Sequence, residues 1–274
     1  MVGKLSKVMA NNGESEKIVA MREGGRILGR LLADLKEYVK PGMTGKEIDA
    51  WVRAEIGKRG AGVAYDMLEE EFPGAICISV NDQLVHGAPT DEILEEGDKV
   101  SFDLDIYYKG YFTDSAFTMI VGEKGSPAVK KMLAVTESAM WEGIEQVRAG
   151  AHIGDIGYAV EKTLRAGKLG VIENYIGHGI GKEMHMAPEV PNYGKRGRGY
   201  VLKAGDTICI EPMACLGKPA NYVVNNEVDW SYVGRYCNAG AVGEYGRGKQ
   251  VVTVALSKCH LENESSGEGR LSDI

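Results

Sequence analysis

The amino-acid sequence predicts a single α/β domain with a central antiparallel sheet and helices outside it. Stretches with helical periodicity alternate with strand-like stretches, and the order helix–helix–strand occurs twice along the chain. A length of 274 residues, with 44% apolar and 26% charged residues, suits one large globular domain. We predict one domain over 1–274, with pseudo-symmetric halves at about 15–121 and 126–255 and a disordered or aberrant tail at 256–274.

The composition argues against several classes of protein. The net charge of −7 does not suit a nucleic-acid-binding surface, and no apolar run approaches the roughly 20 residues of a membrane helix. Residues 1–17 lack the apolar core of a signal peptide. Because the cysteines form no CxxC motif, we expect reduced thiols in a cytoplasmic protein and no thiolate zinc site. The five cysteines are Cys77, Cys209, Cys215, Cys237 and Cys259.

Two helices and a strand are predicted in the first half. Residues 15–39 carry apolar side chains at helical spacing, and Pro41-Gly42 ends this helix. Thr44 and Glu47 have the spacing of a capping box, which predicts that a second helix begins there. The apolar run at 75–80 then predicts a buried strand.

The second half repeats this order. Ser126-Pro127 opens a helix that is predicted to reach about Gly150, and another helix is predicted at roughly 153–167. The sequence at 39–52 resembles that at 147–160, which lies 108 residues later. We interpret the match as a duplication, and a chance match of this length is the alternative.

The stretch 100–121 predicts a β-hairpin that carries two aspartates. If its turn is centred between Tyr108 and Lys109, Asp103 and Asp114 oppose each other on one face. Their Cβ atoms would then lie roughly 4.5–5.5 Å apart. Two ionised carboxylates this close repel, so the pair needs a shared proton or a cation between them. The alternative is a hairpin whose aspartates face water.

Three histidines and a glutamate add donors to this pair. His86, His178 and His185 each lie in a predicted loop beside glycine or proline, and a strand-like run ends in Glu211. A lone loop histidine is more often structural, and the other two histidines are expected on the solvent side. Oxygen and nitrogen donors without thiolate suit Mn, Fe, Co or Zn, and bridging carboxylates can hold two such ions roughly 3.5–4 Å apart.

The full set of motifs resembles that of the type I methionine aminopeptidases, metallopeptidases of the pita-bread fold. The motifs, in the family's order, are N-D-x-x-x-H-G-A-P at 81–89, D-(x10)-D at 103–114, G-H-G-I-G-(x3)-H at 177–185 and I-E-P-M at 210–213. The similarity runs from about Met21 to Trp230, some four-fifths of the chain.

The resemblance implies roles for individual residues. The implied ligands of two divalent metal ions are Asp103, Asp114, His178 and Glu211. The implied lining of a methionine pocket is Tyr175, Cys77, Met184 and Trp230. The family usually carries phenylalanine at the position of Met184. His86 is implied to contact the substrate near the scissile bond and His185 to polarise the scissile carbonyl, while Glu211 is the candidate to pass a proton to the leaving nitrogen.

The implied activity is removal of the initiator methionine from nascent peptides by two-metal hydrolysis of the first peptide bond. We expect a monomer that binds neither nucleic acid nor membrane. Ribosome contact is compatible with this activity, although the sequence shows no motif for it. One alternative is a related peptidase that acts before proline, although such enzymes usually carry an extra N-terminal domain. The other is a catalytically impaired homologue that acts as a binding protein.

The sequence departs from the family after Trp230. The family's fifth ligand is a glutamate in a motif like Q-F/W-E-H-T-V-V-V, whereas the candidate here, Glu244, stands in A-V-G-E-Y-G-R-G. We hypothesise that the segment from Tyr232 onward is read one nucleotide out of frame, because a one-base shift can recover W-E-x-T-V-V-V around 242–248. True divergence is the alternative. This chain is therefore expected to bind one metal well and the second poorly.

The nucleotide sequence of the gene tests the frame hypothesis. We expect the plus-one frame to encode tryptophan and glutamate around position 243, within a run that reads W-E-x-T-V-V-V. Sequencing genomic DNA across this segment measures the frame directly. A plus-one frame without those two codons would show that the segment has diverged.

Overall fold

A computed structural model of the chain describes residues 15–68, 72–226, 229–233 and 249–250, and from residue 222 onward it describes the backbone only. The helices are α1 (Glu16–Tyr38), α2 (Gly45–Lys58), the short 3-10 helix η1 (Tyr65–Met67), α3 (Pro127–Ile144) and α4 (Ile153–Ala166). The strands are β1 (Gly62–Val63), β2 (Cys77–Val80), β3 (Lys99–Tyr108), β4 (Tyr111–Ile120), β5 (Gly170–Val171), β6 (Gly177–Gly179), β7 (Met186–Val190), β8 (Ala214–Cys215), β9 (Tyr222–Asn226), β10 (Asp229–Val233) and β11 (Lys249–Gln250).

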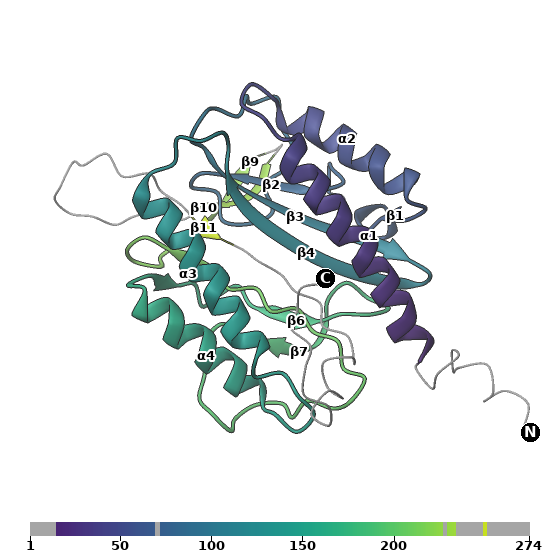
Figure 1. Cartoon of the computed structure of the whole chain (residues 1–274), viewed down its shortest axis with the longest axis vertical. Helices are drawn as coiled ribbons and strands as arrows, with labels where there is room; N and C mark the ends of the chain where they lie inside the picture. The colour runs from purple at the N-terminus through teal and green to yellow at the C-terminus, as the bar shows by residue number, and fades with distance from the viewer. Residues whose placement is uncertain (1–14, 69–71, 227–228, 234–248, 251–274) are drawn as a thin grey trace, which may run out of the picture.

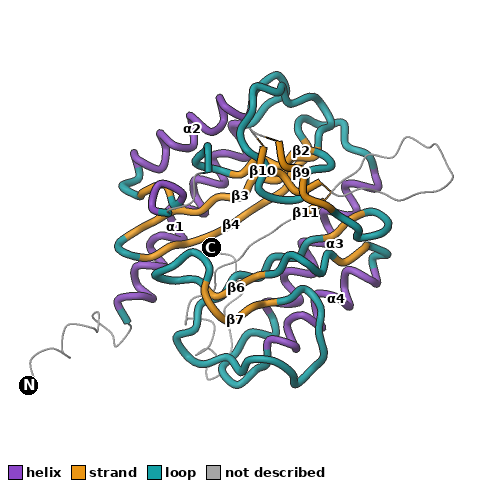
Figure 2. Tube along the Cα trace, turned by 180° about the vertical axis from the view of Figure 1, so that it is seen from behind, coloured by secondary structure: helices purple, strands orange, loops and turns teal. Residues whose placement is uncertain are grey.

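The long helices lie on one side of the strands. Figure 1 shows α1 and α3 in front of the strands, and Figure 2, from behind, shows the strands in front. In the first half β3 is the central strand and pairs antiparallel with β1, β2 and β4. In the second half β8 pairs antiparallel with β5 and β11, and β6 pairs with β7. The predicted α/β class, with antiparallel sheets and outer helices, is confirmed. No helix in the described ranges is long and apolar enough to cross a membrane.

The first two helices begin where their capping residues predict. The Ser15 hydroxyl accepts a hydrogen bond from the backbone N–H of Ile18 at 3.4 Å, and α1 starts at the next residue. Thr44 and Glu47 form the predicted capping box, in which the Thr44 N–H donates to the Glu47 carboxylate at 2.8 Å. These bonds satisfy backbone N–H groups that have no partner within the helix.

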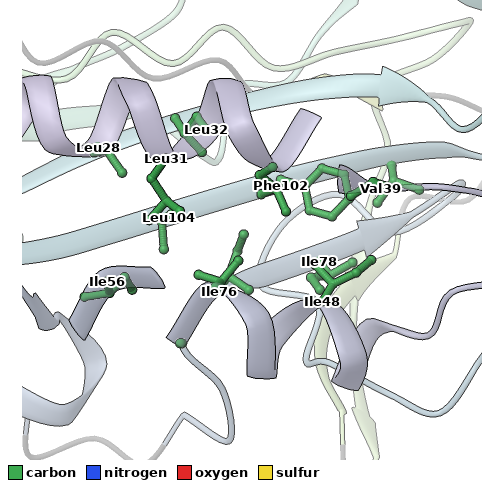
Figure 3. Close-up of a cluster of buried hydrophobic side chains, with 14 of the residues drawn as sticks. Leu28, Leu31, Leu32, Val39, Ile48, Ile56, Ile76, Ile78, Phe102 and Leu104 are labelled. Carbon is green, nitrogen blue, oxygen red and sulfur yellow. The ribbon is translucent and has the colours of Figure 1, made fainter. Parts of the chain in front are cut away.

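The core of the first half lies between these helices and the sheet. Leu28 and Leu31 of α1 and Ile48 of α2 are buried against Phe102 and Leu104 of β3 (Figure 3). Each of these side chains is at most 1% exposed. Burial of one such side chain contributes roughly 1.5–3 kcal/mol, so this apolar layer fixes the orientation of β3. A second cluster packs α3 and α4 onto the strands of the other half.

Alternation along β3 separates the core from a polar face. Phe102, Leu104 and Ile106 point toward the helices, whereas Asp103 and Asp105 point to the opposite side, where they line a cavity. Successive side chains of a strand face opposite sides of the sheet, so the apolar residues determine where the aspartates point.

The predicted register of the hairpin is wrong by one residue on each strand. The turn consists of Lys109 and Gly110, whose φ angles of 50° and 89° belong to a type I′ turn. The turn is therefore centred between these two residues, and Asp105, not Asp103, lies directly opposite Asp114. Asp103 remains on the same face of the sheet as Asp114 and lies diagonal to it. A shift of one residue on both strands changes the partner of each residue but not the face on which its side chain lies.

The first helix of the second half ends earlier than predicted. It stops at Ile144 instead of about Gly150. The N–H groups of Gln146 and Val147 donate to carbonyls three residues back, at 3.1 and 2.9 Å, and not four residues back. This tighter turn ends the α-helical pattern. The helix predicted at 153–167 is observed as α4.

The sequence repeat has a counterpart in the backbone. The N–H of Gly42 donates to the carbonyl of Leu94 at 2.8 Å, and 108 residues later the N–H of Gly150 donates to that of Leu202 at 2.8 Å. Both glycines have positive φ, 95° and 88°. The two halves thus share turn geometry as well as sequence, in agreement with a pseudo-symmetric fold. The predicted domain boundaries stay a prediction.

Removal of the capping hydroxyl at Thr44 should destabilise the fold. We expect Thr44→Ala to lower the free energy of unfolding by about 1 kcal/mol, because the N–H of Glu47 loses its acceptor. Urea unfolding followed by circular dichroism measures the change. The control is Ser138→Ala at an exposed position within α3, where alanine is well accommodated. Equal effects of the two substitutions would contradict the capping role.

Candidate active site

A cavity of about 690 Å³ lies on the polar side of the hairpin. Nine of the predicted site residues line it: Cys77, His86, Asp103, Asp114, Tyr175, His178, Met184, His185 and Glu211. Trp230 lies on β10, where only the backbone is described, and Glu244 lies outside the described residues. The chain thus brings residues from both halves to one concave surface, as expected of a binding or catalytic site.

Glu211 and His178 lie on two segments of the second half that pair irregularly with each other. The run predicted as a strand ending in Glu211 does not form a regular strand; it has isolated bridge residues at Ile208, which pairs with Gly179, and at Cys209. The N–H of Cys209 donates to the carbonyl of His178 at 2.7 Å. A Cβ at Gly177 would lie 2.2 Å from the carbonyl oxygen of Cys209, so glycine is needed for this close approach.

The His178 ring is oriented with one nitrogen toward the cavity, as in a histidine that ligates a metal ion. Its Nδ1–H donates to the carbonyl of Gly179 at 2.9 Å, which leaves Nε2 as the atom facing the cavity. Nε2 lies 3.2 Å from Oε1 of Glu211 and 3.6 Å from Oδ2 of Asp114. Burial lowers the pKa of His178 despite the hydrogen bond to Gly179 and the nearby Asp103 charge. The neutral imidazole is the form that binds metal ions.

The carboxylates of the cavity are poorly satisfied by protein groups. Burial raises the pKa of Asp103 to about 6, and burial together with neighbouring acidic groups raises the pKa values of Asp114 and Glu211 well above their usual range. The Oδ1 atom of Asp114 is buried and has no hydrogen-bond partner. A bound cation would offset the mutual repulsion of the carboxylates and would give the unpartnered oxygen an interaction partner, because it supplies positive charge.

The donors fall into two groups that share one residue. Within each group, one ligand atom from every residue lies within 4.8 Å of the others. One group is Asp114, His178, Cys209 and Glu211, and the other is Asp103, Asp105 and Asp114. The predicted oxygen and nitrogen donors therefore fit divalent metal ions, with Asp114 placed to contribute to both positions.

Among the polar residues of the site, sequence reasoning missed three. Asp105 could have been found, because it stands two residues from Asp103 and must share its face of the strand. The buried thiol of Cys209 lies within the first donor group. The Tyr65 hydroxyl lies 3.1 Å from the Cys77 sulfur at the cavity wall, and no motif in the sequence marked it.

Two further histidines complete the cavity. The rings of His185 and His178 meet edge to face, with centroids 4.4 Å apart. His86 has a φ angle of 59°, a left-handed conformation that non-glycine residues seldom adopt outside functional loops. Burial, and then the charge of His185, lowers the pKa of His86. Both rings are thus held at the cavity, where they can contact a bound molecule.

Similarity to known proteins extends over most of the chain. A model of metallopeptidase family M24 matches residues 19–247. The chain belongs to metallopeptidase family M24. Methionine aminopeptidase 1 of Bacillus subtilis (strain 168) is 37% identical over 213 residues, which are 78% of this chain and 84% of that protein. A methionine aminopeptidase of Clostridium perfringens is 39% identical over 210 residues, 77% of this chain and 82% of that protein.

Solved structures of M24 enzymes share the fold. Methionine aminopeptidase from Rickettsia prowazekii aligns with a TM-score of 0.79 at 30% identity and covers 89% of this chain and 95% of that chain. An X-Pro aminopeptidase from Thermotoga maritima aligns with a TM-score of 0.64 at 20% identity. The alignment covers 92% of this chain but 61% of that chain, and it shows the fold alone. The pita-bread fold and the similarity to methionine aminopeptidases are confirmed.

The stability of the metal-free M24 chain should depend on pH through Asp103. Its pKa is raised from 3.8 to about 6 in the folded state, so between these values the folded state binds more protons than the unfolded state. Stability from this group is therefore full below about pH 4 and is lost as the pH rises through about 6, by at most about 1.4 kcal/mol per pH unit. Urea unfolding of chelator-treated protein at several pH values measures this slope.

Comparison with Asp103→Asn measures the contribution of that carboxyl and of its repulsion with the neighbouring acidic groups. The lowered pKa values of His86 and His178 favour stability at higher pH in both proteins. Removal of the Asp103 charge also lessens the rise in the pKa values of Asp114 and Glu211, which changes the slope in the same direction. We expect the stability of the variant to fall less, or rise more, between pH 4 and 6. Parallel curves for the two proteins would contradict the raised pKa.

Proposed function

We propose that the chain is a metal-dependent methionine aminopeptidase, which hydrolyses the first peptide bond of nascent proteins and removes the initiator methionine. The single observation that carries this proposal is the cavity in which carboxylates and neutral imidazole meet beside an apolar, sulfur-containing wall. The membership of family M24 and the methionine aminopeptidase names of the relatives agree with it.

The proposed metal ligands come from both halves of the chain. The residues that would hold two divalent ions are Asp103, Asp114, His178 and Glu211, with Glu244 as a further predicted ligand. When bound, such ions polarise a carbonyl and lower the pKa of a water molecule so that it becomes a nucleophile. The mixed oxygen and nitrogen set suits Mn, Fe, Co or Zn.

Side chains around the ligands would bind and orient the substrate. The methionine side chain would occupy the part of the cavity lined by Cys77, Tyr175 and Met184, where a thioether makes favourable contacts with sulfur and an aromatic ring. Trp230 is proposed as a further wall of this pocket.

Three residues would act on the reacting atoms. His185, whose ring lies against that of His178, would donate a hydrogen bond to the scissile carbonyl oxygen as negative charge develops on it. His86 would contact the substrate near the scissile bond. Glu211, whose carboxylate lines the same cavity, would pass a proton to the leaving nitrogen.

The cellular setting follows from the substrate. An enzyme that acts on nascent peptides would work in the cytoplasm, as a monomer, and ribosome contact would bring it close to its substrate. It would require neither nucleic acid nor membrane as a partner.

Hydrolysis of a Met-Ala-Ser peptide tests the function. We expect turnover by the chelator-treated chain after addition of Mn²⁺ or Co²⁺, and Asp103→Ala should lower kcat/KM by about 100-fold or more through lost metal binding. Release of methionine measured by chromatography gives the rates. Asp91→Asn, which changes an exposed carboxylate paired with Lys46, is the control and should retain full activity.

Other outcomes would favour the alternatives. Absence of turnover with any divalent metal would support a binding protein, and preferential hydrolysis before proline would support the proline-directed peptidase. Undiminished activity of Asp103→Ala would contradict the ligand assignment.

A further inference from the structure

Asp105 lies at the centre of the acidic face, in a position that the proposed function does not use. It is two residues from Asp103 on β3 and directly opposite Asp114 on β4. One carboxylate oxygen from each of the three residues lies within 4.8 Å of the others. The Asp105 side chain is 5% exposed, so water does not solvate it as it would a surface carboxylate.

The described part of the protein satisfies this carboxylate only in part. The Tyr65 side chain hydrogen-bonds it, but its Oδ1 atom is buried without a hydrogen-bond partner, as is the Oδ1 atom of Asp114. No lysine or arginine within the described ranges forms an ion pair with Asp105. Two opposed residues therefore each bury an oxygen that can only accept hydrogen bonds, an arrangement that costs free energy unless a proton or a cation joins the carboxylates.

A shared proton explains the pair but not the whole cluster. One proton could join Asp105 to Asp114, yet Asp103 and Glu211 add two further acidic groups to the same cavity. The described residues that line the cavity include no lysine or arginine whose charge would compensate these groups. Divalent cations can offset several carboxylates at once, and each unsatisfied oxygen then becomes a ligand.

We propose that Asp105 is a metal ligand, which forms with Asp103 and Asp114 an all-oxygen position that prefers a hard divalent cation such as Mn²⁺. The proposal rests on the metal centre of the proposed function and adds to it a residue at a position that the D-(x10)-D motif leaves unspecified. With Asp105, the described residues offer five oxygen or nitrogen ligands, in addition to the thiol of Cys209: Asp103, Asp105, Asp114, His178 and Glu211. The second position is then complete without Glu244, and weak binding of a second metal is no longer expected.

Titration of metal-free protein with Mn²⁺ tests this without any assay of turnover. Isothermal titration calorimetry of the full chain should show two Mn²⁺ ions bound. Asp105→Asn should retain one at unchanged affinity and bind the other about 10–100-fold more weakly. Asp91→Asn serves as the matched control, because it removes one exposed carboxylate of the same type, and should match the unmodified chain.

Thermal unfolding distinguishes a ligand from a merely structural residue. Without metal, Asp105→Asn should be more stable than the unmodified chain, because one buried acidic group leaves a crowded cluster. The rise in Tm on addition of Mn²⁺ should shrink in the variant. Asp105→Thr, which places a strand-forming residue at the same site, gives a second test if the asparagine variant does not fold.

Three results would overturn the proposal. The first is retention of both Mn²⁺ ions at full affinity by Asp105→Asn and Asp105→Thr. The second is loss of stability without metal together with an unchanged Mn²⁺-induced rise in Tm, which would make Asp105 structural. The third is loss of the second ion in Glu244→Gln but not in Asp105→Asn. Because these readouts measure metal binding, they hold even if the peptide assay fails and the proposed function is rejected.

Discussion

The mutual repulsion of buried carboxylates is the constraint on which the rest of this structure depends. The acidic side chains of the β3–β4 hairpin and Glu211 face one cavity, and burial raises the pKa values of these groups. Such a cluster destabilises the fold unless its charge is compensated. The surrounding apolar layers must therefore hold the carboxylates together, and a bound cation would be coordinated by the same oxygens that otherwise repel one another.

The two halves of the chain meet at this cluster. Asp103 and Glu211 are separated by the same 108 residues that relate the repeated turns at Gly42 and Gly150. Each half thus contributes a carboxylate from an equivalent position, and His178 is added by the second half. Because a metal bound between them would contact both halves, its binding would also stabilise their association.

Short sequence patterns predicted the features that depend on interactions between residues close together in the chain. The capping residues Ser15 and Thr44 mark where helices begin, since the hydrogen bonds involved span three residues. Alternation of apolar and polar residues in 100–121 correctly placed the aspartates on one face. The register failed because it depends on which two residues form the turn, and the positive φ of Lys109 is not apparent from its side chain. The same error hid the pairing of Asp105 with Asp114.

The sequence by itself determined the fold class, the metal-binding chemistry and most residues of the cavity, because these follow from periodicity and from the donor types in four motifs. Only the tertiary structure decided which nitrogen of His178 points inward and that Asp114 of the hairpin meets His178 and Glu211 of the other half. These features depend on distances between strands and loops from different parts of the chain. Such distances are set by packing of the two halves, and no local pattern encodes them.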